Sequence, residues 1–424
     1  MNALSGKAVD VTIVGGGMIT NDLILPSIYH LQRMGVVNAI NVCALNSEPL
    51  KVLKDNAELK QAFPNNDFTP YPGLQTSPQE KFPDLYKDVI AGMDKYNAVV
   101  IAVPDHMHYP ILKEALANDQ HVLCVKPLVL NYRESVEIEK LARDKGLFIG
   151  VEYHKRFDRR SLLAKRHYEQ GELGEFVMGE AKMIEPYFYR FSNFQDWFTV
   201  ENADPFTYVG CHYVDLVWFI TGLKPVGVSV SGVKGKFPNG NEGYMWANGR
   251  VVFENGAILS VTDGLGYPDE GAGSNEQCLT MFCEGDGKSG MIKHNDQFRG
   301  VTHSYLEGIG CAGSSFNFVN PDFFRLVPWE GEGYRPIGYG FDSIAATINT
   351  ISRMELGLDQ LKSDEALMKR REVIEEADQK GIIATPANSF VNELVTEAAR
   401  MSIAREGDFV NIVYGSSPHV ELRG

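Results

Sequence analysis

A strand, a glycine turn and a helix open the chain, and this order constrains the fold more than any other feature. Residues 9–14 alternate apolar and polar side chains and are rich in β-branched residues, which is typical of a strand. Gly15, Gly16 and Gly17 end it, and residues 19–33 carry apolar side chains at helical spacing. Strands are then expected at 39–45, 97–103, 121–125 and 146–151, helices at 49–57, 110–118 and 132–145, and a loop at 64–83. This alternation predicts an α/β domain with a doubly wound parallel sheet.

The alternation of strands and helices ends near residue 152, where long strands joined by hairpins begin. The Glu254-Asn255-Gly256 and 284–287 segments are typical hairpin turns. Strands are expected at 176–186, 226–236, 243–253, 257–261, 276–283 and 289–293, and helices at 211–221, 341–356 and 389–405. We therefore predict a Rossmann-type dinucleotide-binding domain over 1–151. An α+β domain with a large, mostly antiparallel sheet, for substrate binding and oligomerisation, follows over 152–424.

Charge and composition exclude several classes of partner. The 40 Lys and Arg residues are outnumbered by 55 Asp and Glu residues, which gives a net charge of −15. This acidity argues against a nucleic-acid partner and against an anionic membrane surface. No apolar run approaches the roughly 20 residues of a spanning helix, and residues 1–10 lack the apolar core of a signal peptide. We expect a cytoplasmic enzyme.

Neither cysteines nor histidines predict a metal site. The six cysteines are scattered and form no CxxC pair, so neither a zinc framework nor a disulfide scaffold is indicated. His106 and His108 form an H-x-H pair, and His154 follows a later strand of the same sheet. No acidic cluster accompanies these histidines, so we predict no metal.

The glycine turn is the candidate cofactor site, because a dinucleotide pyrophosphate binds where such a turn meets a helix N-terminus. We assign Gly15, Gly17, Met18 and Ile19 to it. The pattern is G-x-G-x-x-T, with Thr20 in the place of the third glycine. The alternative is a glycine-rich surface turn without a ligand.

Asn46 follows the second strand, where an aspartate would bind the ribose 2′-hydroxyl. An asparagine can bond a hydroxyl and does not repel a 2′-phosphate. Lys51 and Lys54, one turn on, could meet such a phosphate or could form an ordinary solvated helix face. The sequence is therefore compatible with either NAD or NADP as the cofactor.

Four motifs resemble the Gfo/Idh/MocA family of nicotinamide-dependent oxidoreductases. They are Ala-Val-Pro-Asp-His-Met-His at 102–108, His-Val-Leu-Cys-Val-Lys-Pro at 121–127, Tyr-His-Lys-Arg-Phe-Asp at 153–158 and Gly-Cys-His-Tyr-Val-Asp at 210–215. The resemblance implies that Pro104 and His108 line the ribose and nicotinamide. It implies that Lys126 is the catalytic lysine of an E-K-P motif and that His212 exchanges a proton with the reacting hydroxyl.

The sequence departs from the family in three places. Thr20 replaces the third glycine, Val125 replaces the glutamate of E-K-P, and Tyr208, four residues before His212, stands where inositol-dehydrogenase-like members carry an aspartate. Tyr208, His212 and Asp215 are spaced four and three apart, which places them on one face if the helix already begins by 208. Tyr208 could then orient His212 or share its proton, and Asp215 could fix its tautomer.

Lys126 and the aromatic segment are the candidate substrate contacts. Lys126 follows an apolar strand and would contact cofactor and substrate at the carboxyl edge of the sheet, although strand-end lysines are often simply exposed. Residues 185–198 hold seven aromatic side chains, which suit the faces of sugar rings but also suit an ordinary core. We assign Lys126, Arg156, Tyr189, Trp197 and His212 to the substrate.

The function predicted from these features is an NAD(P)-dependent dehydrogenase or reductase. It would transfer a hydride between nicotinamide and a secondary hydroxyl or ketone of a sugar or glycoside, with C3 of a pyranoside as the specific expectation. One alternative is a redox-neutral glycoside hydrolase that oxidises C3 transiently and eliminates the aglycone. Another is a cofactor-binding regulator without catalysis. A homo-oligomer, dimer or tetramer, is expected because one face of the antiparallel sheet would be exposed.

Overall fold

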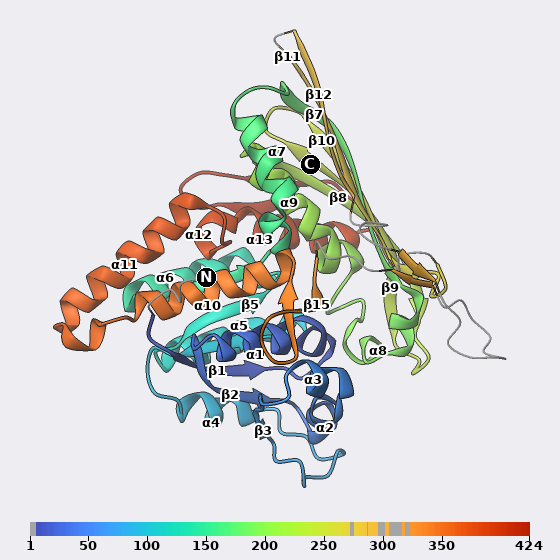
Figure 1. The fold of residues 1–424 in the computed structure, drawn as a ribbon. Coiled ribbons are helices and arrows are strands. Elements are labelled where there is room, and N and C mark those ends of the chain that lie inside the picture. Colours follow the sequence, from blue (N-terminus) through green and yellow to red (C-terminus); the bar gives the residue numbers. More distant parts are fainter. Residues whose placement is uncertain (1–5, 272–274, 286, 296–301, 305–315, 319–322) are drawn as a thin grey trace. The chain divides into compact units, whose positions relative to one another are not determined.

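The computed structural model describes residues 6–271, 275–285, 287–295, 302–304, 316–318 and 323–424 (Figure 1). The chain forms two compact units. The first contains the chain up to Val129, Arg133–His154 and Phe324–Asn388; the second contains Leu130–Tyr132, Lys155–Phe323 and Ser389–Gly424. Among the described residues, no helix is both long and apolar enough to cross a membrane.

The first unit is built on a six-stranded sheet in the order β3-β2-β1-β4-β5-β6, in which all neighbours are parallel. Its strands are β1 (Val9–Val14), β2 (Val37–Cys43), β3 (Thr69–Tyr71), β4 (Ala98–Ile101), β5 (His121–Val125) and β6 (Ile149–Glu152). The central strands are buried on both faces, as parallel sheets require. The predicted doubly wound parallel sheet is thereby confirmed.

Two local predictions in this unit are wrong. Residues 64–83 contain the edge strand β3 rather than only a loop; Pro70 fits there because an edge strand needs fewer N–H donors. The predicted helix 49–57 is two helices, because the Asn56 side chain accepts hydrogen bonds from the N–H groups of Glu58 and Leu59 and starts a new one. The helices near this sheet are α1 (Leu25–Arg33), α2 (Ser47–Asp55), α3 (Ala57–Ala62), α4 (Leu85–Ala91), α5 (His108–Ala117), α6 (Tyr132–Lys145), α10 (Tyr339–Met354), α11 (Ser363–Lys380) and α12 (Pro386–Ser389).

Residues 324–388 pack with the first unit, whereas the predicted boundary at 151/152 assigns them to the second domain. Helix α10 lies against β5, β6 and α1 (Figure 1). The packing on β6 is close, because a Cβ on Gly150 would lie 2.6 Å from Thr347 Oγ1. The hairpin of β15 (Arg325–Pro328) and β16 (Tyr334–Ile337) is fixed by Arg33, which donates to the carbonyl oxygens of Glu332 and Tyr334.

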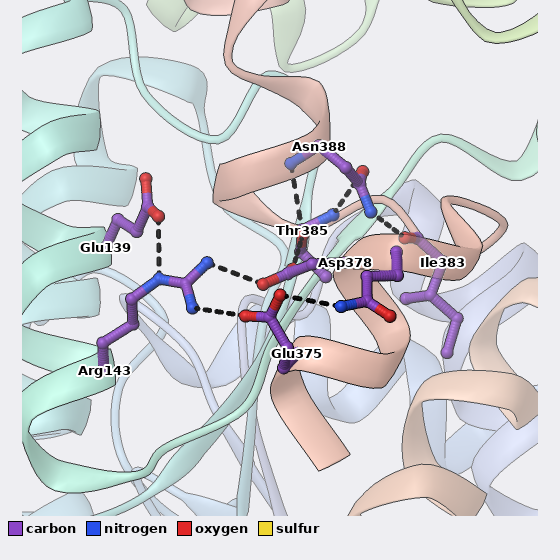
Figure 2. Close-up of polar contacts among 8 residues, drawn as sticks. Glu139, Arg143, Glu375, Asp378, Ile383, Thr385 and Asn388 are labelled. Carbon is purple, nitrogen blue, oxygen red and sulfur yellow. Dashed lines mark hydrogen bonds and ion pairs between the residues drawn. The ribbon is translucent and has the colours of Figure 1, made fainter. Parts of the chain in front are cut away.

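Arg143 on α6 holds α11 in place (Figure 2). Its guanidinium donates to Glu139 at 2.8 Å and to Asp378 at 2.6 Å, and it lies 3.8 Å from Glu375. The hydroxyl of Thr385 donates to the same Asp378 carboxylate. Polar contacts between residues more than 200 positions apart in sequence thus hold α11 in the first unit.

The second unit contains an eight-stranded sheet in the order β12-β11-β7-β10-β9-β8-β17-β18. Only β7 and β10 are parallel neighbours, so the predicted large, mostly antiparallel sheet is confirmed. Its strands are β7 (Glu175–Pro186), β8 (Pro225–Lys236), β9 (Glu242–Phe253), β10 (Ile258–Tyr267), β11 (Glu276–Gly285), β12 (Lys288–Asn295), β17 (Val410–Val413) and β18 (His419–Leu422). The short strands β13 (Thr302–Ser304) and β14 (Phe316–Phe318) pair with each other.

Helices cover one face of this sheet, while the other face carries exposed apolar side chains. The core holds Val214 and Val217 of α9 (Cys211–Thr221) and Leu394 of α13 (Val391–Ile403). The remaining helices are α7 (Arg159–Glu169) and α8 (Phe194–Trp197). Met178, Phe282 and Met291 form one cross-strand row and are 45%, 44% and 57% exposed.

A buried ionic cluster joins the start of β5 to α10 and α11. His121 Nδ1 accepts the N–H of Phe148 at 2.9 Å, so Nε2 carries the hydrogen and donates to Glu355 at 3.0 Å. Arg370 donates to both Glu355 oxygens at 2.7 Å and lies over the Tyr96 ring. Burial opposes ionisation of Glu355, but hydrogen bonds from Arg370 and His121 prevail and lower its pKa to about 2. Burial lowers the pKa of His121.

We predict that this cluster makes the protein acid-sensitive. The folded-state pKa of Glu355 lies below its unfolded value of 4.5, so its contribution is complete above pH 4.5 and is lost as pH falls toward 2. The lowered pKa of His121 changes stability in the same direction: its contribution to stability is lost as the pH falls below 6.5. Glu355→Gln should lower the free energy of unfolding at pH 7 by about 3 kcal/mol. It should also flatten the pH dependence.

Urea unfolding followed by circular dichroism between pH 7 and pH 3 measures both effects. Glu376→Gln is the matched control, because Glu376 pairs with Lys380 on the exposed side of α11 and should leave the profile near native. A Glu355→Gln protein with native stability at pH 7 would contradict the prediction.

Candidate active site

The glycine turn after β1 has the geometry of a phosphate-binding turn. Gly15 has a φ of +116°, and a Cβ there would lie 2.0 Å from the carbonyl oxygen of Ala102, so only glycine fits. A Cβ on Gly17 would meet no atom within 4 Å, which leaves open space at the turn. Thr20 is buried, and its hydroxyl donates to the Gly15 carbonyl at 2.7 Å. Thr20 therefore closes the turn from the position of the third glycine.

The helix after this turn begins at Met18 and contains a π-helical turn, η1 (Thr20–Ile24), before α1. Met18 is 36% exposed and Ile19 is half-buried. The first N–H groups of a helix lack partners within it and carry partial positive charge. Together with the open space at Gly17, they fit the pyrophosphate of a dinucleotide.

Asn46 has a structural role that the sequence does not predict. Its side-chain oxygen caps α2 by accepting the N–H of Glu48 at 3.0 Å, which leaves its amide group as the donor toward a ribose. Lys54, one of the two lysines considered for a 2′-phosphate, binds Asp67 and the Phe68 carbonyl instead. Lys51 lies half-buried on the same helix.

His108 joins the two segments that carry Pro104 and Lys126. Its ring is fully buried, with Nδ1 2.8 Å from the Pro127 carbonyl oxygen and Nε2 3.0 Å from that of Val103. Pro104 and Lys126 are both half-buried, and Lys126 follows the last residue of β5. We predict from the sequence that His108 lines the cofactor. The structure places it between two backbone carbonyls, where it positions its neighbours.

Glu152 and His154 form a polar group that the sequence analysis misses. Glu152 pairs with Val125 across β5 and β6, so it lies at the carboxyl edge beside Lys126. His154 Nδ1 lies 2.9 Å from Glu152 Oε2, Ser343 donates to Oε1 at 2.8 Å, and Tyr339 stacks on the imidazole. A glutamate ending a buried strand is a sequence signal, but Ser343 is 191 residues away. Among the described residues, no group of three His, Cys, Asp or Glu side chains could hold a metal ion.

His212 lies in the first turn of α9, and Tyr208 lies in the helical turn that precedes α9; both belong to the second unit. His212 is only 2% exposed, while Tyr208 is half-buried. Tyr208 belongs to a π-helical turn, η5 (Phe206–Gly210), in which the Cys211 N–H donates to the Phe206 carbonyl. The α-helical spacing assumed between Tyr208 and His212 therefore does not hold, because a π turn has more residues per turn.

Asp215 does not orient His212, which corrects that prediction. Its carboxylate accepts the Arg156 guanidinium through both oxygens, at 2.8 Å from Nε, and the Asn392 amide at 2.8 Å. Arg156 is 1% exposed and lies against the ring of Phe219. The assignment of Arg156 to the substrate is therefore also corrected: this side chain anchors α9.

The aromatic segment contributes to a ring cluster around Phe194. The Phe194 ring centroid lies 4.9 Å from that of Tyr189, 5.0 Å from Trp197 and 5.4 Å from Tyr208. The structure thus brings together three residues that the sequence assigns to substrate or catalysis. Phe194 itself is buried with Phe198 and Leu265.

We predict that replacing only one member of the Arg156–Asp215 pair lowers the free energy of unfolding far more than replacing both members. Arg156→Met leaves a buried carboxylate with only Asn392, so the free energy of unfolding should fall by about 3–5 kcal/mol. The double variant Arg156→Met/Asp215→Leu should recover much of this loss. Chemical denaturation of both variants tests the prediction, and equal loss in the two would contradict it.

Two family models match the chain, one for each domain. Residues 9–153 match the model of an oxidoreductase family with an NAD-binding Rossmann fold, and residues 162–284 match the GFO/IDH/MocA C-terminal domain. An uncharacterized oxidoreductase of Schizosaccharomyces pombe is 39% identical over 98 residues, which is 23% of this chain and 27% of that protein. The chain thus matches only about a quarter of the length of such curated relatives.

Solved structures resemble the chain over nearly its full length. Myo-inositol 2-dehydrogenase from Lactobacillus plantarum has a TM-score of 0.60 at 18% identity, covering 96% of this chain and 100% of that one. An inositol dehydrogenase homologue from Azotobacter vinelandii, complexed with NADH and myo-inositol, has a TM-score of 0.60 at 17% identity, covering 96% and 98%. At such identity the likeness shows the fold alone. With both domain models matched in order, the chain belongs to the Gfo/Idh/MocA family of NAD-dependent oxidoreductases.

Proposed function

We propose that this oxidoreductase transfers a hydride between nicotinamide and a secondary hydroxyl or ketone of a sugar or glycoside, with C3 of a pyranoside as the reacting carbon. One observation carries the proposal: His108 binds the segments after β4 and β5 together, which fixes Lys126 at the carboxyl edge of the sheet. Ligands of open parallel sheets bind at that edge. The inositol dehydrogenases among the relatives support a polyhydroxylated substrate.

The reaction needs a group that stabilises charge on oxygen and a group that takes a proton. When bound, nicotinamide accepts the hydride. Lys126 would donate from its ammonium to the substrate oxygen and stabilise the developing negative charge. His212 would take the hydroxyl proton on a ring nitrogen. Gly15, Gly17, Met18, Ile19, Asn46 and Pro104 would hold the cofactor.

The ring cluster is the proposed wall for the sugar. Tyr189 and Trp197 are half-buried and offer apolar ring surface; Trp197 lies next to Tyr208, and Tyr189 lies next to Phe194. Tyr208 would orient His212 from the π-helical turn that precedes α9, rather than from one α-helical turn away. The second candidate is the redox-neutral hydrolase, in which Tyr208 would act on a leaving aglycone; its place in this ring cluster supports that candidate.

The assembly and location follow the same proposal. The exposed row of Met178, Phe282 and Met291 would be covered by a second copy of the chain, as a dimer or tetramer. We propose a cytoplasmic enzyme with a small carbohydrate substrate.

A substrate panel separates the candidates. The protein is incubated with NAD or NADP and with free sugars, inositols and methyl glycosides, and absorbance is followed at the reduced-nicotinamide band. A dehydrogenase accumulates reduced cofactor, whereas a hydrolase releases aglycone without net reduction. A regulator does neither.

We predict that Lys126→Ala lowers turnover by about 10² or more, because an aligned charged donor to the oxyanion is lost. Cofactor affinity should change little. Lys113→Ala, at an exposed position of α5, is the control. Near-native turnover of Lys126→Ala would remove this residue from the mechanism.

We predict that His212→Ala abolishes the acidic limb of the pH–rate profile together with most of the rate, because only neutral imidazole accepts a proton. Tyr208→Phe should cost about tenfold, or about 1.4 kcal/mol of barrier, with the profile unchanged, if the phenol only orients His212. A much larger loss confined to aglycone release would favour the hydrolase. A native acidic limb in His212→Ala would rule out the proton role.

We predict that Asn46→Asp shifts coenzyme preference toward NAD. Aspartate is also a good helix cap, so α2 should keep its start while a carboxylate now repels the 2′-phosphate of NADP. The native protein should discriminate by under roughly 3 kcal/mol, within about two decades. Calorimetric titration measures this, with Lys54→Ala as a control that leaves NADP affinity unchanged. Complete exclusion of NADP by the native protein would contradict the prediction.

A further inference from the structure

His108 makes two contacts that a neutral imidazole cannot both make as hydrogen bonds. Its buried ring stands at the start of α5, with Nδ1 2.8 Å from the Pro127 carbonyl oxygen and Nε2 3.0 Å from the Val103 carbonyl oxygen. A carbonyl oxygen only accepts hydrogen bonds, and a neutral imidazole carries a hydrogen on one ring nitrogen only. The imidazolium donates from both nitrogens. The observed geometry is therefore that of the protonated ring.

A neutral His108 would hold one of these segments and lose its hold on the other. In either neutral tautomer, a nitrogen lone pair would face a carbonyl oxygen at 2.8 or 3.0 Å, where no hydrogen lies between them. Two acceptors at such a distance repel each other, so that contact should lengthen. Loss of the proton would therefore release either Val103, after β4, or Pro127, after β5.

Both segments belong to the edge of the sheet that is proposed to bind the cofactor. A Cβ on Gly15 would lie 2.0 Å from the Ala102 carbonyl oxygen and 3.3 Å from Val103 Cγ1, so the glycine turn packs closely on the first segment. The second segment carries Lys126, which directly precedes Pro127. Movement of either segment would therefore reach a group that is proposed to act on the cofactor or the substrate.

The charges around His108 act in opposite directions. Burial and the N-terminus of α5 disfavour a positive charge on the ring. The two carbonyl dipoles favour it, as does the buried carboxylate of Asp105 on η2 (Asp105–Met107), three residues earlier. The elements packed against α5 bring further ionisable side chains, while β4 brings none; these are His106 of η2, Lys126 after β5, His121 at the opposite end of β5, and Tyr86, Lys87 and Asp88 of α4. Opposing influences of this kind allow a buried histidine to exchange its proton.

We propose that His108 is a proton-dependent clamp on the cofactor side of the active site. The imidazolium binds both segments and holds the glycine turn and Lys126 in place, whereas the neutral ring holds only one segment. NAD should therefore bind the protonated form more tightly, and its binding should take up protons. This assignment rests on the proposed function, because it takes the two segments as walls of the cofactor site. His108 is then a positioning residue rather than a contact of the ribose.

Proton uptake on NAD binding tests the clamp on the full chain, without any substrate. Calorimetric titrations with NAD are run between pH 6 and pH 8.5 in buffers of different ionisation enthalpy. The native protein should take up protons as NAD binds, and its affinity should fall by roughly fivefold or more as the pH rises. His108→Gln, whose side chain cannot gain a charge, should bind NAD more weakly, with neither the proton uptake nor the pH dependence. His106→Gln, at an exposed position two residues earlier, is the matched control and should behave as the native protein does.

The hydrogens on the ring are measured directly by nitrogen-15 magnetic resonance of the histidine-labelled native protein. At pH 6, both ring nitrogens of His108 should carry a hydrogen. The His108 resonances are assigned by their loss in His108→Gln, or in His108→Asn if the glutamine variant does not fold.

The outcomes separate the clamp from the proposed function. A His108 ring with one hydrogen at every pH from 6 to 8.5 overturns the clamp. Tight NAD binding without proton uptake also overturns it and leaves the proposed function standing. Proton uptake that persists in His108→Gln and disappears in His106→Gln overturns the assignment to His108. A native protein that binds no NAD at any pH contradicts the cofactor site, and the proposed function falls with it.

Discussion

The carboxyl edge of the parallel sheet is the constraint on which the candidate site depends. A parallel sheet buried on both faces forces every strand to end at one edge, so residues far apart in sequence collect there. Gly15, Lys126 and Glu152 follow or end β1, β5 and β6. His108 then fixes the spacing between the segments that follow β4 and β5 through backbone carbonyls. Because His108 contacts backbone carbonyls rather than surface side chains, the backbone position from which the Lys126 side chain extends is fixed.

Buried ion pairs form the frame of each unit and are separate from the groups proposed for chemistry. In the first unit, Glu355 and Arg370 secure the returning helices; in the second, Arg156 and Asp215 secure α9. Such pairs add little net stability but are costly to break from one side, which makes the geometry specific. His212 stands on the helix fixed by Asp215, so the aspartate acts on the helix position rather than on the imidazole.

Local pattern predicted the elements well, and long-range contacts account for most failures. The bounds of β1, β5, α6 and α9 agree with the predicted ranges, because each has a clear period and a clear stop. The partners of Asp215 lie 59 and 177 residues away, which no spacing rule on one helix could find. Likewise, nothing local marks 324–388 as part of the first unit, since its attachment runs through Glu355 and Arg143. A prediction between residues close in sequence also failed, because the π turn at Tyr208 changes the assumed α-helical spacing to His212.

The most direct test of the central claim follows a labelled hydrogen. Methyl and phenyl glycosides carrying deuterium at C2, C3 or C4 in turn are incubated with the protein and oxidised cofactor, and the reduced cofactor is analysed by mass spectrometry. The account predicts deuterium in the reduced nicotinamide from the C3-labelled glycosides alone, with slower turnover of those substrates. Deuterium arriving from another carbon would contradict the C3 assignment. Unlabelled, unreduced cofactor with intact glycosides throughout would contradict hydride transfer from a glycoside ring.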